Sequence, residues 1–326
     1  MIPHLLEDLR KRDILIWAEA GRIRYDAAPG ALTPEVVGRL REHREEILRH
    51  LERDGDLPDA AQDAHVPSGP EGGGGGEIRL RPLLREAGGA GANGTGTARA
   101  VVFVLPPAGA GPAMFQRWRE EVPADLDVVL VHAPGREERL EEAAYTHVAP
   151  LADRVAEAVG SYDDRAFVLL GHSAGALVAR EVARRVGSPR LRLLAVAGSP
   201  APDAVTGDEA EADDGTLLDA MAAWGGTPGE ILADPDACSV FLPCLRADLS
   251  VVASCRKSPE ARERLDIPVI AFSGTEDQVV THEEMRDWRH WTDGSFRIHR
   301  VPGGHFFPVT SGAAIFASIT RALDDR

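Results

Sequence analysis

Cysteine is scarce in this sequence, and its few thiols are poorly placed for structural chemistry. The chain of 326 residues has three cysteines, Cys238, Cys244 and Cys255. Their spacing matches no zinc-binding pattern, and an odd number of thiols suits a reducing compartment better than a disulfide framework. We therefore expect free thiols and no cysteine-ligated zinc site in a cytoplasmic protein.

Long apolar runs and excess positive charge are also missing. Glu7 and Asp8 stand among the first residues, and no run long enough for a signal peptide or a membrane-spanning helix follows them. Acidic residues outnumber basic ones by 52 to 36, which gives a formal net charge of -16. This charge argues against nucleic acid or an anionic membrane surface as the partner.

What the sequence does contain indicates two domains joined by a linker. Residues 56–76 carry three prolines and end in five consecutive glycines, a composition typical of a flexible tether. Residues 1–55 before it can form only a small unit. Residues 77–326 after it are long enough for one large domain with a substantial core.

The small unit has the pattern of a helix, a hairpin and a second helix. Residues 14–17 and 23–25 are strand-like, and Gly21-Arg22 between them predicts a tight turn. Thr33-Pro34 is typical of a helix start. The two helices are indicated by leucines and other apolar residues at helical spacing: Leu5, Leu6, Leu9, Val36, Val37, Leu40, Ile47, Leu48 and Leu51. Such a small α+β unit has little core of its own, so we expect it to self-associate or bind a partner.

The large domain alternates between apolar strands and helical stretches. This alternation is typical of an α/β fold with a mostly parallel sheet covered on both faces. Between residues 200 and 257 an acidic loop and amphipathic helices interrupt the rhythm, and we interpret them as a lid. The expected strands are residues 78–84, 100–105, 128–132, 167–170, 191–197, 268–272 and 296–301.

The most specific motif is Gly171-His172-Ser173-Ala174-Gly175. An apolar strand runs directly into it and a helix follows, as in the nucleophile elbow of serine hydrolases. The small flanking residues permit a tight turn that presents the hydroxyl of Ser173 above the sheet. The motif therefore predicts a nucleophilic serine.

A nucleophilic serine needs a base and an acid, which in this fold follow it in the order acid, then histidine. His305 follows the last expected strand in a Gly-Gly-His sequence and is the predicted base, whereas His282, His290 and His299 lie within an expected helix or strand. Asp277 after the strand 268–272 is the predicted acid. Asp203, after the preceding strand, is the alternative.

The negative charge that develops during attack on a carbonyl requires two hydrogen-bond donors. The backbone N–H of Ala174, directly after the serine, is one candidate. The small residues of Pro106-Pro107-Ala108-Gly109 follow the strand 100–105 and allow a backbone to approach the substrate, so the N–H of Ala108 is the other.

Residues 77–326 resemble the type II thioesterases of nonribosomal peptide and polyketide synthetases, which are α/β-hydrolases. The resemblance implies Ser173, Asp277 and His305 as the triad and Ala108 and Ala174 as the oxyanion donors. Pro107 and Ala174 depart from the His and Met that are common in the family. The matching segments are residues 106–111, 134–139, 171–175, 225–228, 242–248 and 303–307, together with Trp288.

Residues 1–55 resemble the TubC-type N-terminal docking domain, through residues 16–25 and 29–35. The resemblance implies binding of the C-terminal tail of an upstream synthetase subunit at the hairpin edge. The candidate docking residues are Trp17, Arg22, Arg24 and Tyr25.

Together the two resemblances imply a serine thioesterase that docks in trans and cleaves acyl or peptidyl chains from the phosphopantetheine arm of a carrier protein. The implied reaction requires no metal and no bound cofactor. Two alternatives stay open at this point. The enzyme can release its chain to an amine or hydroxyl rather than to water, or the hydrolase domain can be an inert scaffold. Arg136 and Glu137 are interpreted as residues of a structural turn, with an ion pair between them at the site entrance as the alternative.

Overall fold

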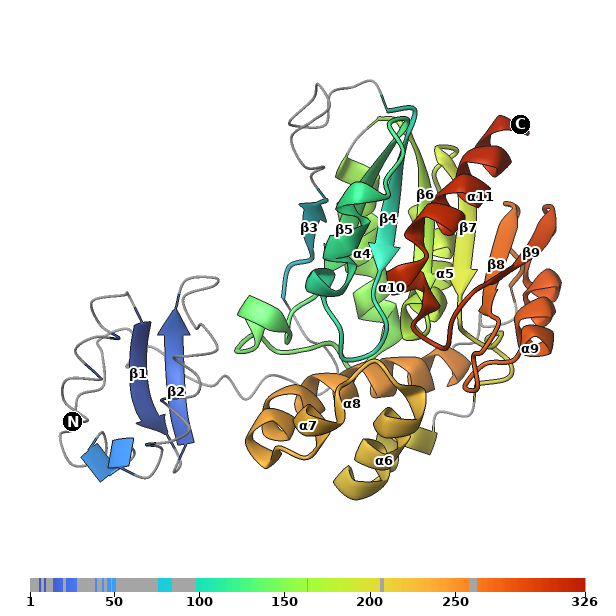
Figure 1. Cartoon of the computed structure of the whole chain (residues 1–326). Coiled ribbons are helices and arrows are strands. Elements are labelled where there is room, and N and C mark those ends of the chain that lie inside the picture. The colour runs from blue at the N-terminus through green and yellow to red at the C-terminus, as the bar shows by residue number, and fades with distance from the viewer. Residues whose placement is uncertain are drawn as a thin grey trace. The chain divides into compact units, whose positions relative to one another are not determined.

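The computed structural model describes the chain as two compact units, Met1–Gly69 and Pro70–Arg326 (Figure 1). In the second unit it describes residues 76–83, 98–162, 164–205, 208–257 and 263–325. In the first unit it describes residues 14–19 and 22–27 and eight single positions: 6, 9, 39, 43, 46, 47, 49 and 50.

The first unit contains the expected hairpin. Strands β1 (Ile14–Glu19) and β2 (Arg22–Ala27) pair in antiparallel register. The expected turn at Gly21-Arg22 is wrong by one residue, because Arg22 is the first residue of β2 and pairs with Glu19. Outside the hairpin, Leu6, Leu9 and Ile47 are buried, and the N–H of Ile47 donates to the carbonyl of His43 over 2.9 Å, as in a helix. Most of the two expected helices, and all of the expected linker 56–76 except Gly76, lie outside the described residues.

A seven-stranded sheet organises the second unit. Its strand order is β3-β5-β4-β6-β7-β8-β9, and every neighbouring pair is parallel except β3 with β5. The expected mostly parallel sheet is therefore confirmed. The strands are β3 (Arg79–Pro82), β4 (Ala100–Leu105), β5 (Leu126–His132), β6 (Ala166–His172), β7 (Leu191–Ala197), β8 (Val269–Gly274) and β9 (Phe296–Val301).

Alternate residues of the central strands enter two separate cores, because successive side chains of a strand point to opposite faces. Val101 and Phe103 of β4 pack on one face with α4 (Val148–Tyr162) and α5 (Ala174–Val186). Val102 and Val104 pack on the other face with the 3-10 helix η2 (Pro112–Glu120) and α11 (Gly312–Asp324). Figure 1 shows α11 on the opposite side of the sheet from α4 and α5. Both faces are covered, as a parallel sheet requires.

Shorter elements connect the last strands. Between β8 and β9 lie α9 (His282–Arg286) and the 3-10 helix η5 (Asp287–Trp291), and α10 (Phe307–Thr310) precedes α11. Another 3-10 helix, η3 (Glu137–Arg139), follows β5. These connections leave the carboxyl ends of the parallel strands free to carry loops, which is where the candidate site lies.

Three helices form the segment expected to be a lid: α6 (Asp214–Trp224), α7 (Gly229–Leu232) and α8 (Pro235–Lys257), preceded by the 3-10 helix η4 (Asp208–Glu211). Helices α6 and α8 share a small apolar cluster that includes Leu217 and Leu242. Figure 1 shows them beyond the carboxyl ends of the parallel strands.

The apolar character of α8 is explained by its packing. Within the described part of the chain, Pro235–Cys255 is the one stretch with the length and hydropathy of a membrane-crossing helix. Half of that window is buried inside the structure, and α8 contacts both α4 and α5.

Candidate active site

Ser173 sits in a tight turn between β6 and α5. Its backbone φ is 52° and ψ is -123°, a strained conformation of a kind that persists where the surroundings hold it in place. A Cβ on Gly171 would lie 2.3 Å from the carbonyl oxygen of Gly175, and one on Gly175 would lie 2.2 Å from that of Leu105. Side chains are thus excluded at both glycines, as expected for a nucleophile elbow.

His305 lies beside Ser173 at the end of the loop that follows β9. Its Nε2 is 3.3 Å from the hydroxyl oxygen of Ser173, and its Nδ1 is 3.1 Å from Oδ2 of Asp277. The imidazole is buried. The three side chains therefore form one hydrogen-bonded chain across loops that follow β6, β8 and β9.

The carboxylate of Asp277 is held in its ionised form. Burial alone would raise its pKa, but hydrogen bonding with His305 and the N–H groups of Val279 and Val280 outweighs burial and lowers the pKa. An ionised carboxylate can only accept hydrogen bonds, so Nδ1 of His305 carries the hydrogen. Its Nε2 is then free to accept a proton from the hydroxyl of Ser173.

The other candidate residues lie apart from this chain of hydrogen bonds. Asp203 is exposed in the turn after β7. His282 is bonded through Nδ1 to the hydroxyl of Ser273 over 2.7 Å, and His299 of β9 stacks on Phe272 of β8. His290 is exposed at the surface, next to Arg289.

The choice of acid can be tested by two matched substitutions. Asp277→Asn is expected to lower kcat at least about 10²-fold, because an amide would favour the wrong tautomer of His305. Asp203→Asn is the control and should leave kcat within about twofold, as expected for an exposed group. Thiol release from a short acyl thioester measures both, and the reverse ranking would transfer the role to Asp203.

The two predicted oxyanion donors border one cavity. Ala174 begins α5, and Ala108 lies in the loop between β4 and η2, packed against the apolar cluster of the lid. Both line a cavity of about 40 Å³ whose walls are otherwise mostly apolar. The other lining residues are Leu105, Pro106, Val131, Ala133, Arg136, Leu151, Val155, Gly175, Val178, Asp248 and Val251.

His172, which sequence reasoning did not select, braces the base. Its Nε2 lies 3.0 Å from the carbonyl oxygen of His305 and donates to it. Burial, reinforced by the nearby imidazole of His305, lowers the pKa of His172 to about 3. The ring is neutral at physiological pH and holds the backbone of the loop that carries His305.

Arg136 makes an ion pair, but not with Glu137. Its guanidinium binds both carboxylate oxygens of Asp248 on α8, each over 2.9 Å, and both side chains are buried. Glu137 instead accepts the N–H of Ala113 over 2.8 Å. The alternative of an Arg136–Glu137 pair is wrong, because the carboxylate of Asp248 binds both terminal nitrogens of the guanidinium. A partner 112 residues away gave no local signal in the sequence.

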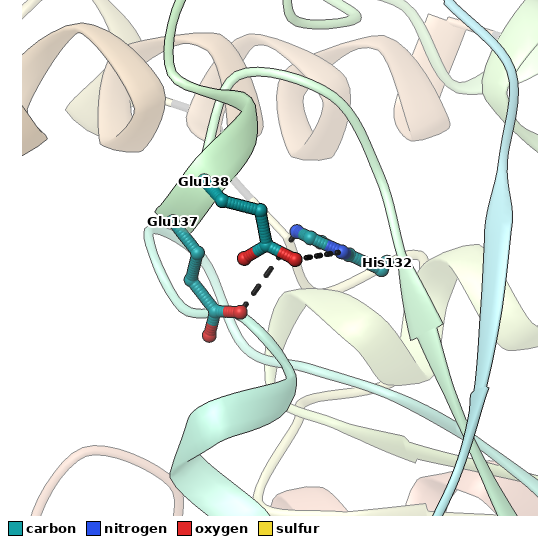
Figure 2. A group of neighbouring side chains, drawn as sticks. All are labelled: His132, Glu137 and Glu138. Atoms are coloured by element: carbon teal, nitrogen blue, oxygen red, sulfur yellow. Dashed lines mark ion pairs between the residues drawn. The ribbon is translucent and has the colours of Figure 1, made fainter. Parts of the chain in front are cut away.

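His132, Glu137 and Glu138 form a group with the residue types of a metal site (Figure 2). His132 is fully buried, and its two nitrogens lie 3.8 Å from Glu137 and 3.7 Å from Glu138. The guanidinium of Arg81 pairs with Glu138 over 2.6 Å and lies 3.7 Å from Glu137. A positive charge already occupies this cluster, so we assign it to the ion-pair network at the edge of the sheet.

The three cysteines are buried and free, as expected. Burial raises the pKa of Cys244 and that of Cys255 to about 12 in each case. A thiol with such a pKa is almost wholly protonated at neutral pH, so neither competes with Ser173 as a nucleophile.

The four candidate docking residues all lie on the hairpin of the first unit. In its register Trp17 faces Arg24 across the two strands, Ile16 faces Tyr25 and Glu19 faces Arg22. Trp17 and Arg24 are thus opposite one another, and Tyr25 is next to Arg24 along β2. The described part of the unit consists mainly of these two strands.

Comparisons with known proteins identify the families of the two parts of the chain. Residues 100–323 match the thioesterase domain family, and residues 2–53 match the TubC N-terminal docking domain family. The gramicidin S biosynthesis protein GrsT of Aneurinibacillus migulanus is 33% identical over 221 residues, which cover 66% of this chain and 86% of that protein.

Solved structures of thioesterases share the fold. RedJ, the thioesterase from the prodiginine biosynthetic pathway of Streptomyces coelicolor, is 36% identical with a TM-score of 0.59, and the match covers 70% of this chain and 87% of RedJ. YbtT, a type II thioesterase from the yersiniabactin NRPS/PKS pathway, is 27% identical with a TM-score of 0.64, and the match covers 74% of this chain and 97% of YbtT. The chain belongs to the thioesterase family of the α/β-hydrolase fold and carries a TubC docking domain at its N-terminus.

Proposed function

We propose that this thioesterase cleaves acyl or peptidyl thioesters from carrier proteins of a nonribosomal peptide or hybrid polyketide synthetase, with Ser173, His305 and Asp277 as its catalytic residues. The observation that carries the proposal is the hydrogen-bonded chain from Asp277 through His305 to Ser173. The substrate arrives on the phosphopantetheine arm of the carrier, so the enzyme itself needs no bound cofactor.

In the first step Ser173 is acylated. His305 Nε2 takes the proton of the Ser173 hydroxyl as its oxygen attacks the thioester carbonyl. The backbone N–H groups of Ala108 and Ala174 stabilise the negative charge on the former carbonyl oxygen. The carbon–sulfur bond then breaks, and the proton on His305 passes to the departing thiolate of the phosphopantetheine arm.

In the second step water releases the acyl chain. His305 takes a proton from water, whose oxygen attacks the acyl carbon. The bond between the acyl carbon and the oxygen of Ser173 then breaks, and His305 returns the proton to that oxygen. Asp277 stabilises the imidazolium that forms in both steps, and its lowered pKa keeps it ionised for that task. The products are the free acid and the thiol of the carrier.

The N-terminal unit is proposed to bring the enzyme to its partner. We expect the hairpin of β1 and β2 to bind the C-terminal tail of an upstream synthetase subunit in the cytoplasm, by addition of a peptide at a strand edge. Trp17, Arg22, Arg24 and Tyr25 are the residues assigned to that contact. Self-association of this unit would be compatible with its small core.

Removal of the docking unit should separate recognition from chemistry. Deleting residues 1–70 is expected to leave hydrolysis of a small free thioester within about twofold of the full chain, because the triad and the main cores lie beyond the cut. Turnover of acyl chains on the cognate subunit should fall sharply at low enzyme concentration, because docking raises the local concentration of enzyme.

The concentration dependence supplies the control for this deletion. Enzyme at about millimolar concentration, the range of effective molarity for short flexible tethers, should restore the rate of the truncated form. Equal rates of truncated and full-length enzyme on the cognate subunit at every concentration would show that residues 1–55 do not dock the enzyme to it.

A further inference from the structure

The lid helix α8 touches the loop that carries the predicted oxyanion donor Ala108. Asp248 of α8 accepts the N–H of Gly109 through Oδ2 over 2.7 Å. Leu245, one turn earlier on the same helix, would lie 3.3 Å from a Cβ placed on Gly109. The peptide unit that follows Ala108 is therefore fixed by a hydrogen bond to the lid and by close packing against it.

Arg136 holds the same loop from a second direction. Its Nη1 binds Oδ2 of Asp248 over 2.9 Å and donates to the carbonyl of Ala110 over 3.0 Å. Its Nη2 binds Oδ1 of Asp248 over 2.9 Å. A buried, bidentate ion pair thus contacts the backbone of both residues that follow Ala108, one through an N–H and one through a carbonyl.

The nucleophile elbow contacts the other end of this loop. A Cβ on Gly175 would lie 2.2 Å from the carbonyl oxygen of Leu105 and 2.5 Å from that of Pro106. The loop from Pro106 to Ala110 is therefore pinned by the elbow at its start and by Asp248 and Arg136 at its end. Ala108 lies between these two anchors, on the wall of the same cavity as Ala174.

We propose that Asp248 is a positioning residue of the oxyanion hole, which sets the orientation of the Ala108 N–H only while the lid helix α8 is seated and Arg136 holds its carboxylate. This role rests on the proposed function, because it assumes that the loop stabilises an oxyanion. Seating of the lid and assembly of the hole are then one event. An acyl chain that keeps α8 from packing against the loop leaves Ser173 in place but without one of its two donors.

The chemistry of the carboxylate makes this role specific. Both oxygens of Asp248 accept hydrogen bonds, from Gly109 and from two nitrogens of Arg136. Asparagine has the same shape but only one acceptor oxygen, and its amide group is a donor that would face another donor. Asp248→Asn therefore changes the loop contacts with the least change in packing.

The experiment compares Asp248→Asn with Asp214→Asn on a short acyl thioester of N-acetylcysteamine. Asp214 also pairs with an arginine of α8, Arg246, but on the exposed side of the lid. We expect Asp248→Asn to lower kcat about 10- to 100-fold with little change in KM, since loss of a whole donor costs about 10²- to 10³-fold. Asp214→Asn should retain the kcat and KM of the wild-type enzyme.

A second readout reports on the hole itself. A short-chain trifluoromethyl ketone forms a hemiketal on Ser173, and nuclear magnetic resonance measures the pH at which its hydroxyl ionises. We expect that pKa to rise by about one unit in Asp248→Asn, because a displaced donor stabilises the oxyanion less. Arg136→Lys, which keeps the charge but loses the bidentate contact, should shift it in the same direction and serves if Asp248→Asn does not fold.

The outcomes separate this inference from the proposed function. Wild-type kcat and an unchanged hemiketal pKa in Asp248→Asn, or in Arg136→Lys if only that variant folds, would overturn the positioning role. Equal losses of kcat in Asp248→Asn and Asp214→Asn would also overturn it, since a general weakening of the lid would explain them. Failure of the wild-type enzyme to form the hemiketal would instead contradict the assignment of Ser173.

Discussion

Ser173→Ala is expected to lower kcat for a simple acyl thioester by about 10³-fold or more while the fold is retained. The alanine removes the atom that forms the acyl-enzyme, and triad members act as a unit, so His305 and Asp277 cannot compensate. The residual rate should come from binding and the oxyanion donors alone. The assay is thiol release, with circular dichroism to confirm the fold.

Ser199→Ala is the matched control for this loss. Ser199 is buried and follows the neighbouring strand β7, and its hydroxyl contacts only the carbonyl of Pro200 among its described side-chain bonds. It should keep nearly full activity. Activity of Ser173→Ala within tenfold of the wild-type enzyme would refute Ser173 as the nucleophile.

His305→Ala should cause a loss as large as that of Ser173→Ala, because the hydroxyl of Ser173 is a poor nucleophile without a base 3.3 Å away. Its test is labelling by a fluorophosphonate probe together with thiol release. Both should fall about 10³-fold or more. His290→Ala, at an exposed position in η5, should leave both rates unchanged.

A different result for His305→Ala would point to another base. His282 and His172 are two other histidines of the described structure, but each has a different partner: the hydroxyl of Ser273 for His282 and the carbonyl of His305 for His172. Near-normal labelling of Ser173 in His305→Ala would therefore contradict the arrangement as a whole.

The elements around Ser173 could be predicted from sequence because their signals are local. The apolar run of β6 leads directly into Gly171. The glycines at 171 and 175 are required because a Cβ at either position would lie 2.3 Å or less from a backbone oxygen. The ends of the strands before Asp277 and His305 could also be predicted, because the apolar runs that mark them are local. The chain order of this fold then limited the candidates for acid and base to a few.

The contacts that brace the site could not be predicted, because they join residues far apart in the chain. Arg136 and Asp248 are separated by 112 positions, and His172 and His305 by 133. Nothing in the sequence around Arg136 indicates that it pairs with Asp248 rather than with Glu137, the residue that follows it. The partner is determined by the packing of α8 against the loop after β4, which brings Asp248 to Arg136.

The docking unit illustrates a different limit. The existence of its hairpin was within reach of the sequence, because two strand-like runs flank Gly21. Its register was not, since a two-residue turn at Gly21-Arg22 would pair Ala20 with Ile23, whereas Ile23 pairs with Ala18. The identity of its partner was not, since an edge strand presents the same backbone groups to any peptide. Specificity at such an edge depends on side-chain complementarity to a tail that is not part of this chain.

The most direct test of the account is mass spectrometry of a carrier protein from the same pathway, loaded with its acyl chain and incubated with the full-length enzyme in ¹⁸O-labelled water. We expect the carrier to return to its unloaded mass and the acyl chain to appear as a free acid with one oxygen from water, and Ser173→Ala to show neither change. An acyl-carrier that persists equally with wild-type enzyme and Ser173→Ala, or a released product without the label, would contradict hydrolysis of carrier-bound thioesters.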